Sequence, residues 1–365
     1  MITVLVTGVG GGGHGRQVLK ALRMSQQGYR IVGTDMTAMS MGLYEVDRAA
    51  IVPGATDPDY VMALLDLCKC EGVKVLITGS EPELLAVAKH RDEFLSAGVL
   101  PLINTPHCLD VCMDKHKTLD FLSNCGLPTP WYQQADTKYP LHIPAYRFPV
   151  IVKPSVSSGG SAHVYLAQNN EELSFFVRYV QRQGLSPVVQ QYIGSYDQEY
   201  TVGVLTDLHD GSLIGSIALR RYNLSGLSNR MRVYKSPSNR YDSGSGNRSG
   251  EPYVISSGIS QGEVQDFPEV RDVCEQIAIK LGSKGPMNFQ CRKDNDRVYV
   301  FEINPRFSGT TGMRALLGFN EPDILIRRSL LNEKDIKVEY KKGVVLRGLE
   351  ERYIELGTSN QGTLL

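Results

Sequence analysis

The chain has 365 residues, and 39 Lys and Arg balance 39 Asp and Glu. This length suggests two to three domains of roughly 150 residues each, and the formal net charge of zero argues against non-specific binding to nucleic acids or to membrane surfaces. No apolar run approaches the roughly 20 residues of a transmembrane helix, and the N-terminal apolar run lacks the basic start and cleavage site of a signal peptide.

The cysteines are scattered along the chain and form no C-x-x-C pair, and their number, 7, is odd. A disulfide framework or a zinc site is therefore not expected. The pattern favours buried, reduced thiols in a cytoplasmic protein.

The first part of the chain alternates short apolar strands with helices. Strands are expected at 2–8, 30–35, 73–78 and 99–103. Helices of this length between strands are typical of a parallel sheet covered on both faces. The sequence therefore predicts a Rossmann-like α/β unit at the N-terminus.

A glycine-rich turn follows the first strand. Gly8, Gly10 and Gly13 form G-x-G-x-x-G, and Asp35 ends the second strand, which is the arrangement of an NAD(P)-binding fold. The alternative is that the glycines only let the strand and helix pack closely. Nothing downstream resembles a dehydrogenase site, so an NAD(P)-binding enzyme is the less favoured interpretation.

Acidic residues follow the third expected strand, where sheets of this kind bind ligands. Ser80 and Glu83 have the spacing of a capping box, which explains them as the start of a helix. The alternative is that Glu81 or Glu83 meets an amine.

The pattern changes after residue 113. Residues 114–126 predict a helix and 127–130 a linker, and 148–167 predict a strand, a glycine-rich loop and a strand. Lys153 ends an apolar strand and is followed by small residues, namely Ser157, Ser158, Gly159, Gly160 and Ser161. Backbone N–H groups of such a loop can surround phosphate oxygens, and a lysine adds a point charge. An ordinary hairpin is the alternative.

An irregular connection follows the strand expected at 187–193. Such a hinge, within residues 188–200, leaves backbone groups free to bond an adenine edge. Glu199 would then be placed for ribose hydroxyls. A plain domain crossover is the alternative.

The next segments predict hairpins. One joins 199–207 to 212–221, and alternation directs either Arg220 or Arg221 inward. We take Arg220 as the candidate ligand of a substrate carboxylate, with a structural salt bridge as the alternative. Residues 222–252 show no internal element, so they are either a substrate lid or a disordered insertion.

The second hairpin joins 286–293 to 297–304 and ends in FEINPR. Alternation places Glu302 and Asn304 on one face, and Gln290 lies on the partner strand. Oxygen ligands of this kind suit Mg²⁺ shared with a phosphate chain, and Arg306 is available to a phosphate. A partly buried polar pair at a strand end is the alternative.

Taken in order, these motifs resemble the ATP-grasp superfamily, in particular ligases related to the large subunit of carbamoyl-phosphate synthase. The motifs are DK at 114–115, VKP with SSGG, QQYI with its following glutamate, and FEINPR. The resemblance implies a Rossmann-like domain (1–112) that helps to form the substrate site, a small lid subdomain (113–192) and a large subdomain with a C-terminal extension (193–365). The second half of a full synthetase is absent, so a true carbamoyl-phosphate synthase is not expected.

The resemblance also implies residue roles. Lys115, Lys153 and the 157–161 lid would contact ATP phosphates, Gln190 to Ile193 the adenine, and Glu199 the ribose. Mg²⁺, with Mn²⁺ as the alternative ion, would be held by Gln290, Glu302 and Asn304, and Arg306 would lie near the transferred phosphate. The hinge has Gln190-Gln191 where a glutamate is common in the family.

The implied activity is that of an ADP-forming carboxylate–amine (or carboxylate–thiol) ligase working through an acyl phosphate. Arg306, Lys153 and Arg220 are its candidate catalytic residues. The expected partners are a small-molecule carboxylate and amine, without nucleic acid or membrane, and a homodimer is the assembly considered. A non-catalytic ATP-binding sensor is the alternative from another class.

Overall fold

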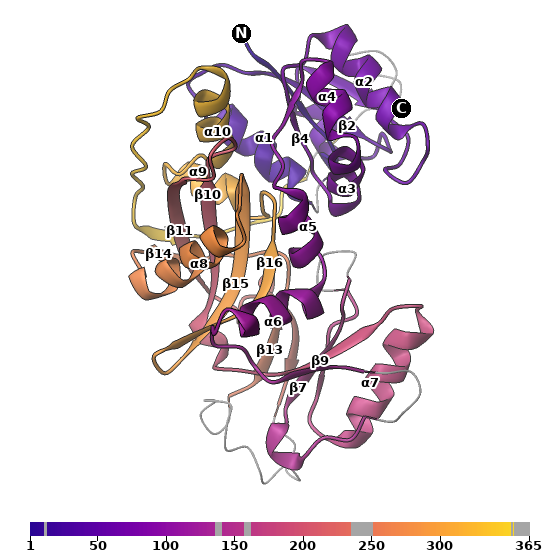
Figure 1. Cartoon of the computed structure of the whole chain (residues 1–365), viewed down its shortest axis with the longest axis vertical. Helices are drawn as coiled ribbons and strands as arrows, with labels where there is room; N and C mark the ends of the chain where they lie inside the picture. The colour runs from indigo at the N-terminus through magenta and orange to yellow at the C-terminus, as the bar shows by residue number, and fades with distance from the viewer. Residues whose placement is uncertain (11–12, 136–140, 157–161, 235–250, 352, 354–365) are drawn as a thin grey trace.

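The computed structural model describes residues 1–10, 13–135, 141–156, 162–234, 251–351 and 353. A parallel sheet with its helices lies at the top of Figure 1, a large antiparallel sheet lies in the middle, and a small antiparallel sheet lies at the bottom. The predicted fold class, an N-terminal Rossmann-like α/β domain with a parallel sheet followed by two α+β subdomains, is confirmed.

The N-terminal sheet is parallel throughout, in the order β3-β2-β1-β4-β5. Its strands are β1 (Thr3–Val6), β2 (Arg30–Asp35), β3 (Arg48–Ile51), β4 (Val75–Ile77) and β5 (Leu100–Pro101). Around it lie α1 (Gly15–Arg23), η1 (Met41–Tyr44), α2 (Tyr60–Glu71), α3 (Glu81–Lys89) and α4 (Arg91–Ser96). Strand β3 was not predicted, because this short edge strand with exposed ends lacks a long apolar run.

Two helices lead from this sheet to the small one. They are α5 (Pro106–Cys112) and α6 (Lys115–Asn124). The small sheet has the order β6-β9-β7-β8, with β6 (Tyr132–Gln134), β7 (Val150–Pro154), β8 (Tyr165–Ala167) and β9 (Pro187–Gln191). Helix α7 (Asn170–Arg182) covers it with the apolar face of Leu173, Val177 and Val180, and η2 (Ala145–Arg147) precedes β7.

The large sheet is antiparallel, in the order β16-β15-β10-β11-β14-β17. Its strands are β10 (Glu199–Thr206), β11 (Leu213–Arg221), β14 (Gly262–Gln265), β15 (Pro286–Asp294), β16 (Arg297–Asn304) and β17 (Gly343–Val345), with η3 (Tyr196–Gln198) before β10. Helices α8 (Pro268–Lys280), α9 (Thr311–Leu316) and α10 (Glu321–Leu330) belong to the same part of the chain. Both predicted hairpins, β10–β11 and β15–β16, are present.

The segment 222–252 differs from the prediction. Strand β12 (Asn229–Val233) lies inside it and pairs with β13 (Tyr253–Ser256). This strand is partly exposed along its length and contains few apolar residues, so no apolar periodicity indicated it. Residues 235–250, which include Lys235, Arg240 and Arg248, lie outside the described residues.

One apolar core joins the N-terminal sheet to the large sheet. Val4 and Leu19 of the first domain belong to the same buried cluster as Leu219 of β11 and Phe319 and Leu325 near α10. The small sheet has its own core beneath α7. Within the described residues, no helix is long and apolar enough to cross a membrane.

The cysteines are all free, as predicted. Those with buried side chains are Cys68, Cys108, Cys112, Cys274 and Cys291.

Candidate functional site

A pocket lies where the small sheet faces the large sheet, between β7 and β9 on one side and β15 and β16 on the other. It encloses about 850 Å³, part of which is open to solvent. Residues predicted from separate motifs line it together, namely Lys115, Lys153, Gln190, Gln191, Tyr192, Ile193, Glu199, Gln290 and Glu302. Segments spread over almost 190 positions of sequence therefore meet in one cavity.

Lys115 is fixed by the start of α6. The Asp114 carboxylate caps this helix by accepting hydrogen bonds from the backbone of His116 (2.8 Å) and Lys117 (3.2 Å). The hydroxyl of Ser155, two residues beyond Lys153, also donates to Asp114, and the Lys115 backbone donates to the Ser155 carbonyl (2.8 Å). The DK motif thus ties α6 to the end of β7.

Lys153 lies on β7 with its side chain buried. Its Nζ donates to the Phe301 carbonyl at 3.1 Å. Burial, together with the positive charge of Lys115, lowers the pKa of Lys153 to about 7, against a smaller opposite effect of Glu302. An anionic group in this pocket would favour the charged form of Lys153.

A bulge in β16 creates the acceptor for Lys153. Gln290 pairs with Glu302, but the next residue of β15, Cys291, pairs with Val300, so Phe301 has no cross-strand partner. An extra residue of this kind bends the strand and frees backbone groups. As a result the neighbours Phe301 and Glu302 both line the pocket, although strict alternation would direct them to opposite faces.

The predicted metal set is a compact group of oxygen donors. Gln290 and Glu302 are directly opposite across β15 and β16, and the Asn304 amide donates to Glu302 Oε1 at 3.3 Å. One carboxylate with two amide oxygens beside a phosphate pocket fits Mg²⁺, which retains waters and takes part of its shell from substrate phosphates. Among the described residues, no group of three or more His, Cys, Asp or Glu is placed to hold a metal.

Arg306 connects this group to the N-terminal domain. Its Nη2 donates to Asn304 Oδ1 (3.1 Å) and to Glu81 Oε1 (2.8 Å). Its Nε is buried and makes no hydrogen bond to any described residue. Of the acidic residues after β4, Glu81 therefore reaches the site, whereas Ser80 and Glu83 form the expected capping box, with the Ser80 hydroxyl donating to Glu83 at 2.7 Å.

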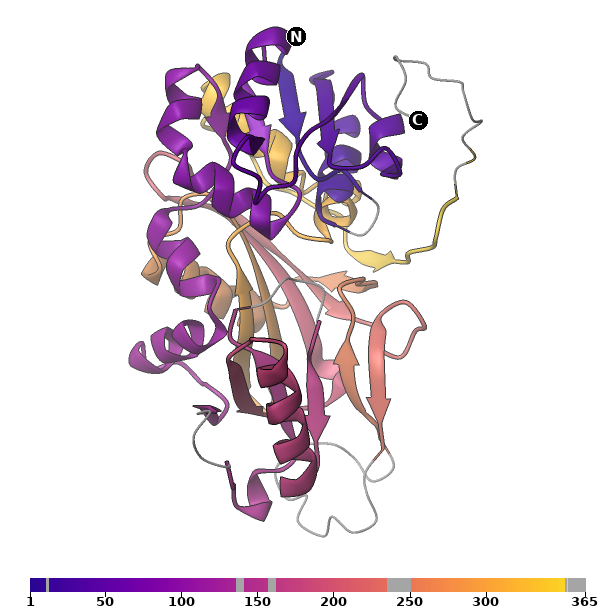
Figure 2. The same ribbon diagram turned by 90° about the vertical axis from the view of Figure 1, so that its right-hand side faces the viewer.

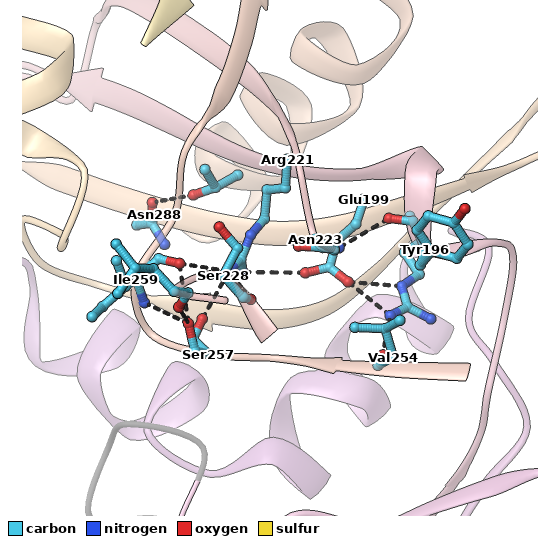
Figure 3. A network of polar contacts seen from close by, with 12 residues as sticks. Tyr196, Glu199, Arg221, Asn223, Ser228, Val254, Ser257, Ile259 and Asn288 are labelled. Atoms are coloured by element: carbon cyan, nitrogen blue, oxygen red, sulfur yellow. Dashed lines mark hydrogen bonds and ion pairs between the residues drawn. The ribbon is translucent and has the colours of Figure 1, made fainter. Parts of the chain in front are cut away.

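Glu199 is completely buried between arginines. Arg292 donates to Glu199 Oε2 through Nε (2.9 Å) and Nη2 (2.7 Å), and Arg221 Nη1 lies 3.1 Å from Oε1 (Figure 3). Burial by itself would raise the pKa of Glu199, but Arg292 and Arg221 outweigh it and hold the pKa below its ordinary value. Oε1 makes no hydrogen bond to any described residue, and its contact with a ribose hydroxyl stays a prediction.

Sequence reasoning missed Arg292. It lies two residues after Gln290 on β15 and therefore on the same face, and its guanidinium carbon stacks 4.2 Å from the Tyr192 ring centre. Side chains alternate along a strand, so the predicted role of Gln290 could have indicated that Arg292 faces the same site. Tyr299 and Phe301 add apolar lining that no motif indicated.

The hinge differs from the prediction in its backbone. The N–H groups of Gln191 and Tyr192 are not free, because they donate to the carbonyls of Trp131 (2.8 Å) and Pro149 (3.0 Å). The buried side-chain Oε1 of Gln190, by contrast, makes no hydrogen bond to any described residue. The hinge therefore offers the side-chain oxygen of Gln190 to a ligand in place of these two backbone N–H groups.

The structure does not bring Arg220 to the pocket. Its side chain is partly exposed and forms an ion pair with Glu263 on β14 at 2.6 Å. Arg221 is the inward residue of the pair, and its Nη2 donates to the carbonyls of Ser257 (2.8 Å) and Ile259 (3.3 Å). Arg220 thus forms a structural salt bridge, which was the alternative to a substrate contact. The register between β11 and β14 places Arg220 opposite Glu263 and so determines this pairing.

The N-terminal glycines pack closely. Asp35 accepts from the backbone of Gly10 at 2.8 Å, and a Cβ on Gly15 would lie 2.3 Å from the Gly8 carbonyl oxygen. The carboxylate that an NAD(P) site would need is engaged by the turn itself. The predicted phosphate lid, Ser157 to Ser161, lies outside the described residues.

Two family models match the chain. Residues 4–103 match the PylC-like N-terminal domain, and residues 254–352 match the ATP-grasp in the biosynthetic pathway with Ter operon. Among curated proteins, the chain is 27% identical over 294 residues to the carbamoyl phosphate synthase large chain of Halomonas eurihalina, covering 80% of this chain and 24% of that one. The large chain of Mycobacterium tuberculosis is 30% identical over 242 residues, covering 66% and 19%.

Solved structures share the fold. An L-amino acid ligase from Bacillus licheniformis superposes with a TM-score of 0.61 at 18% identity, covering 93% of this chain and 78% of that one. D-alanine–D-alanine ligase from Bacillus anthracis in complex with ATP gives 0.55 at 16% identity, covering 92% and 98%. The chain is therefore an ATP-grasp protein related to the carbamoyl phosphate synthase large chain, of whose length it spans about a quarter.

Proposed function

We propose that the chain is an ATP-dependent, ADP-forming ligase that joins a carboxylate to an amine through an acyl phosphate. The observation that carries the proposal is the convergence of two buried lysines with Gln290 and Glu302 in one pocket. Cations beside oxygen donors suit a magnesium-bound phosphate chain. The names of the structural neighbours, which include ligases and carboxylases, support the same class.

The reaction has two steps. In the first, a substrate carboxylate oxygen attacks the γ-phosphorus of ATP, the bond from that phosphorus to the bridging oxygen breaks, and ADP leaves with the bond electrons. In the second, the amine nitrogen attacks the acyl carbon, the bond to the phosphate oxygen breaks, and the nitrogen loses a proton. Positioning and charge neutralisation supply most of the catalysis in phosphoryl transfer.

The protein's own residues would divide these tasks. Lys115 and Lys153 offset charge on the phosphates, and the apolar side chains of Tyr299 and Phe301 keep water from that end of the pocket. Gln290, Glu302 and Asn304 would hold Mg²⁺, which supplies further charge neutralisation when bound. Arg306, which joins Asn304 to Glu81, would face the acyl group and the transferred phosphate.

The decisive experiment measures ADP release with MgATP across a matrix of small carboxylates and amino compounds. A pair that releases ADP and phosphate in equal amounts supports the proposal. Release of AMP and pyrophosphate would reject the mechanism. Tight MgATP binding without turnover on any pair would favour the sensor alternative, and micromolar NAD(H) binding would revive the dinucleotide interpretation.

A further inference from the structure

The chain that follows β17 passes from the large sheet back towards the N-terminal domain. Figure 2 shows it in yellow, leaving β17 in that direction. Glu350 anchors it there, because its carboxylate pairs with Arg16 (2.7 Å) and Lys20 (3.2 Å) of α1. This segment, residues 346–350, is called the C-terminal strap below.

Arg347 of the strap contacts helix α1 and two loops. Its Nη2 donates to Gln17 Oε1 at 3.1 Å and to the Gly309 carbonyl, and its backbone N–H donates to Gln261 Oε1 at 3.1 Å. A Cβ on Gly309 would lie 3.2 Å from the Gly258 carbonyl oxygen, so the 308–310 loop is packed against the 257–261 loop. Arg347 therefore lies beside the loop that begins at Arg306.

The charge of Arg347 has no counter-ion among the described residues. Its partners are a side-chain amide and a carbonyl, whereas Arg221, Arg306 and Arg314 each pair with a carboxylate. Burial, together with the positive charge of Arg221, lowers the pKa of Arg347 to about 10. Glu350 also anchors the strap, through two ion pairs.

We infer that Arg347 is a specificity residue that receives a carboxylate of the second substrate, so that the amine acceptor is an amino acid. The inference rests on the proposed ligase function. Arg347 donates to the carbonyl of Gly309, three residues after Arg306, so the loop that carries Arg306 also holds a guanidinium without a counter-ion among the described residues. A guanidinium with free N–H donors binds a carboxylate in a bidentate manner.

The test is direct binding, with each proteinogenic amino acid and its carboxamide as probes. Calorimetry is carried out in the presence of magnesium and a non-hydrolysable ATP analogue. We expect at least one free amino acid to bind the wild-type protein roughly 10- to 100-fold more tightly than its amide. Arg347→Met abolishes that preference, Arg347→Lys retains part of it, and the exposed Lys342→Met in the same part of the chain leaves it unchanged.

Clear results would overturn the inference. These are the absence of amino acid binding to the wild-type protein, an unchanged preference for the free acid in both Arg347 variants, or binding of inorganic phosphate alone that depends on Arg347. Nucleotide binding by the variants reports that they are folded. If a free amino acid binds through Arg347 but no pair of substrates releases ADP, the proposed ligase function is wrong. In that case the assignment of Arg347 as the residue that binds the carboxylate is still supported.

Discussion

At Lys153, burial and a neighbouring lysine oppose the ammonium charge, and the pKa falls from 10.5 to about 7. Below pH 7 the lysine is protonated in both the folded and the unfolded protein, so folding bears the whole cost of the buried charge. Between pH 7 and about 10.5 the folded protein binds fewer protons than the unfolded chain, and its stability rises with pH. Without a bound anion, the buried charge of Lys153 therefore destabilises the folded protein most at acidic pH.

Replacing the charge should relieve this cost. We expect Lys153→Met to raise the free energy of unfolding at pH 6 by an amount on the order of a few kcal/mol, because each pKa unit corresponds to about 1.4 kcal/mol. Near pH 9, where Lys153 is already neutral in the folded protein, the increase should be much smaller. Urea unfolding at both pH values measures it. Lys280→Met, at the exposed end of α8, is the control; equal gains at the two pH values would contradict the assignment.

Glu302 is the single carboxylate of the predicted metal set. Glu302→Gln keeps the shape and the acceptor oxygen while removing the negative charge, so the fold should survive and ADP release should fall by about 100-fold or more at limiting Mg²⁺. Steady-state kinetics against Mg²⁺ concentration measure the change, with exposed Glu339→Gln as the matched control. Unchanged turnover in Glu302→Gln would remove this residue from the site.

At the scale of the element, the start of α6 has two functions. Its cap stabilises the helix, and the same carboxylate holds Ser155 beyond β7. In this way a local sequence signal, Asp before Lys, sets the position of a lysine relative to a strand far away in the chain.

Asp114→Ala should therefore affect stability and binding together. Loss of the cap costs about 1 kcal/mol of unfolding free energy, and the affinity for ATP should fall because Lys115 loses its fixed position. Asp110→Ala is the control, since Asp110 pairs with Lys117 on the surface without capping the helix. If the two variants weaken ATP binding equally, the cap does not position Lys115.

At the scale of the whole molecule, the first domain and the large sheet share one apolar core, and the single tryptophan, Trp131, packs on the separate core of the small sheet. The ligand pocket lies between these two bodies.

A fragment of residues 104–365 tests this arrangement. Removal of the first domain exposes side chains such as Phe319 and Leu325, each of which contributes about 1.5–3 kcal/mol when buried. We expect the fragment to lack a cooperative urea transition by circular dichroism, whereas the full chain shows one. If the fragment unfolds cooperatively at the same urea concentration as the full chain, the domains fold independently.

Much of the architecture was predictable because its signals are local. Alternation predicted the two long hairpins, and the motifs at Asp114, Lys153 and FEINPR, taken in order, resemble those of ATP-grasp proteins. Strands β3 and β12 escaped prediction, since short, partly exposed edge strands carry little apolar periodicity.

The sequence by itself indicated the class of protein, through the resemblance of its motifs to the ATP-grasp superfamily, and it supplied nine residues that line the pocket. It could do so because each motif consists of set residue types at a set spacing within one element. Only the tertiary structure decided that Arg221 rather than Arg220 turns inward, that Arg292 holds Glu199, and that Glu81 reaches Arg306. These choices depend on strand register, on the bulge at Phe301 and on contacts between distant segments. A change of register by one residue reverses the direction of every side chain in a strand, and no local pattern specifies which segments meet across a fold.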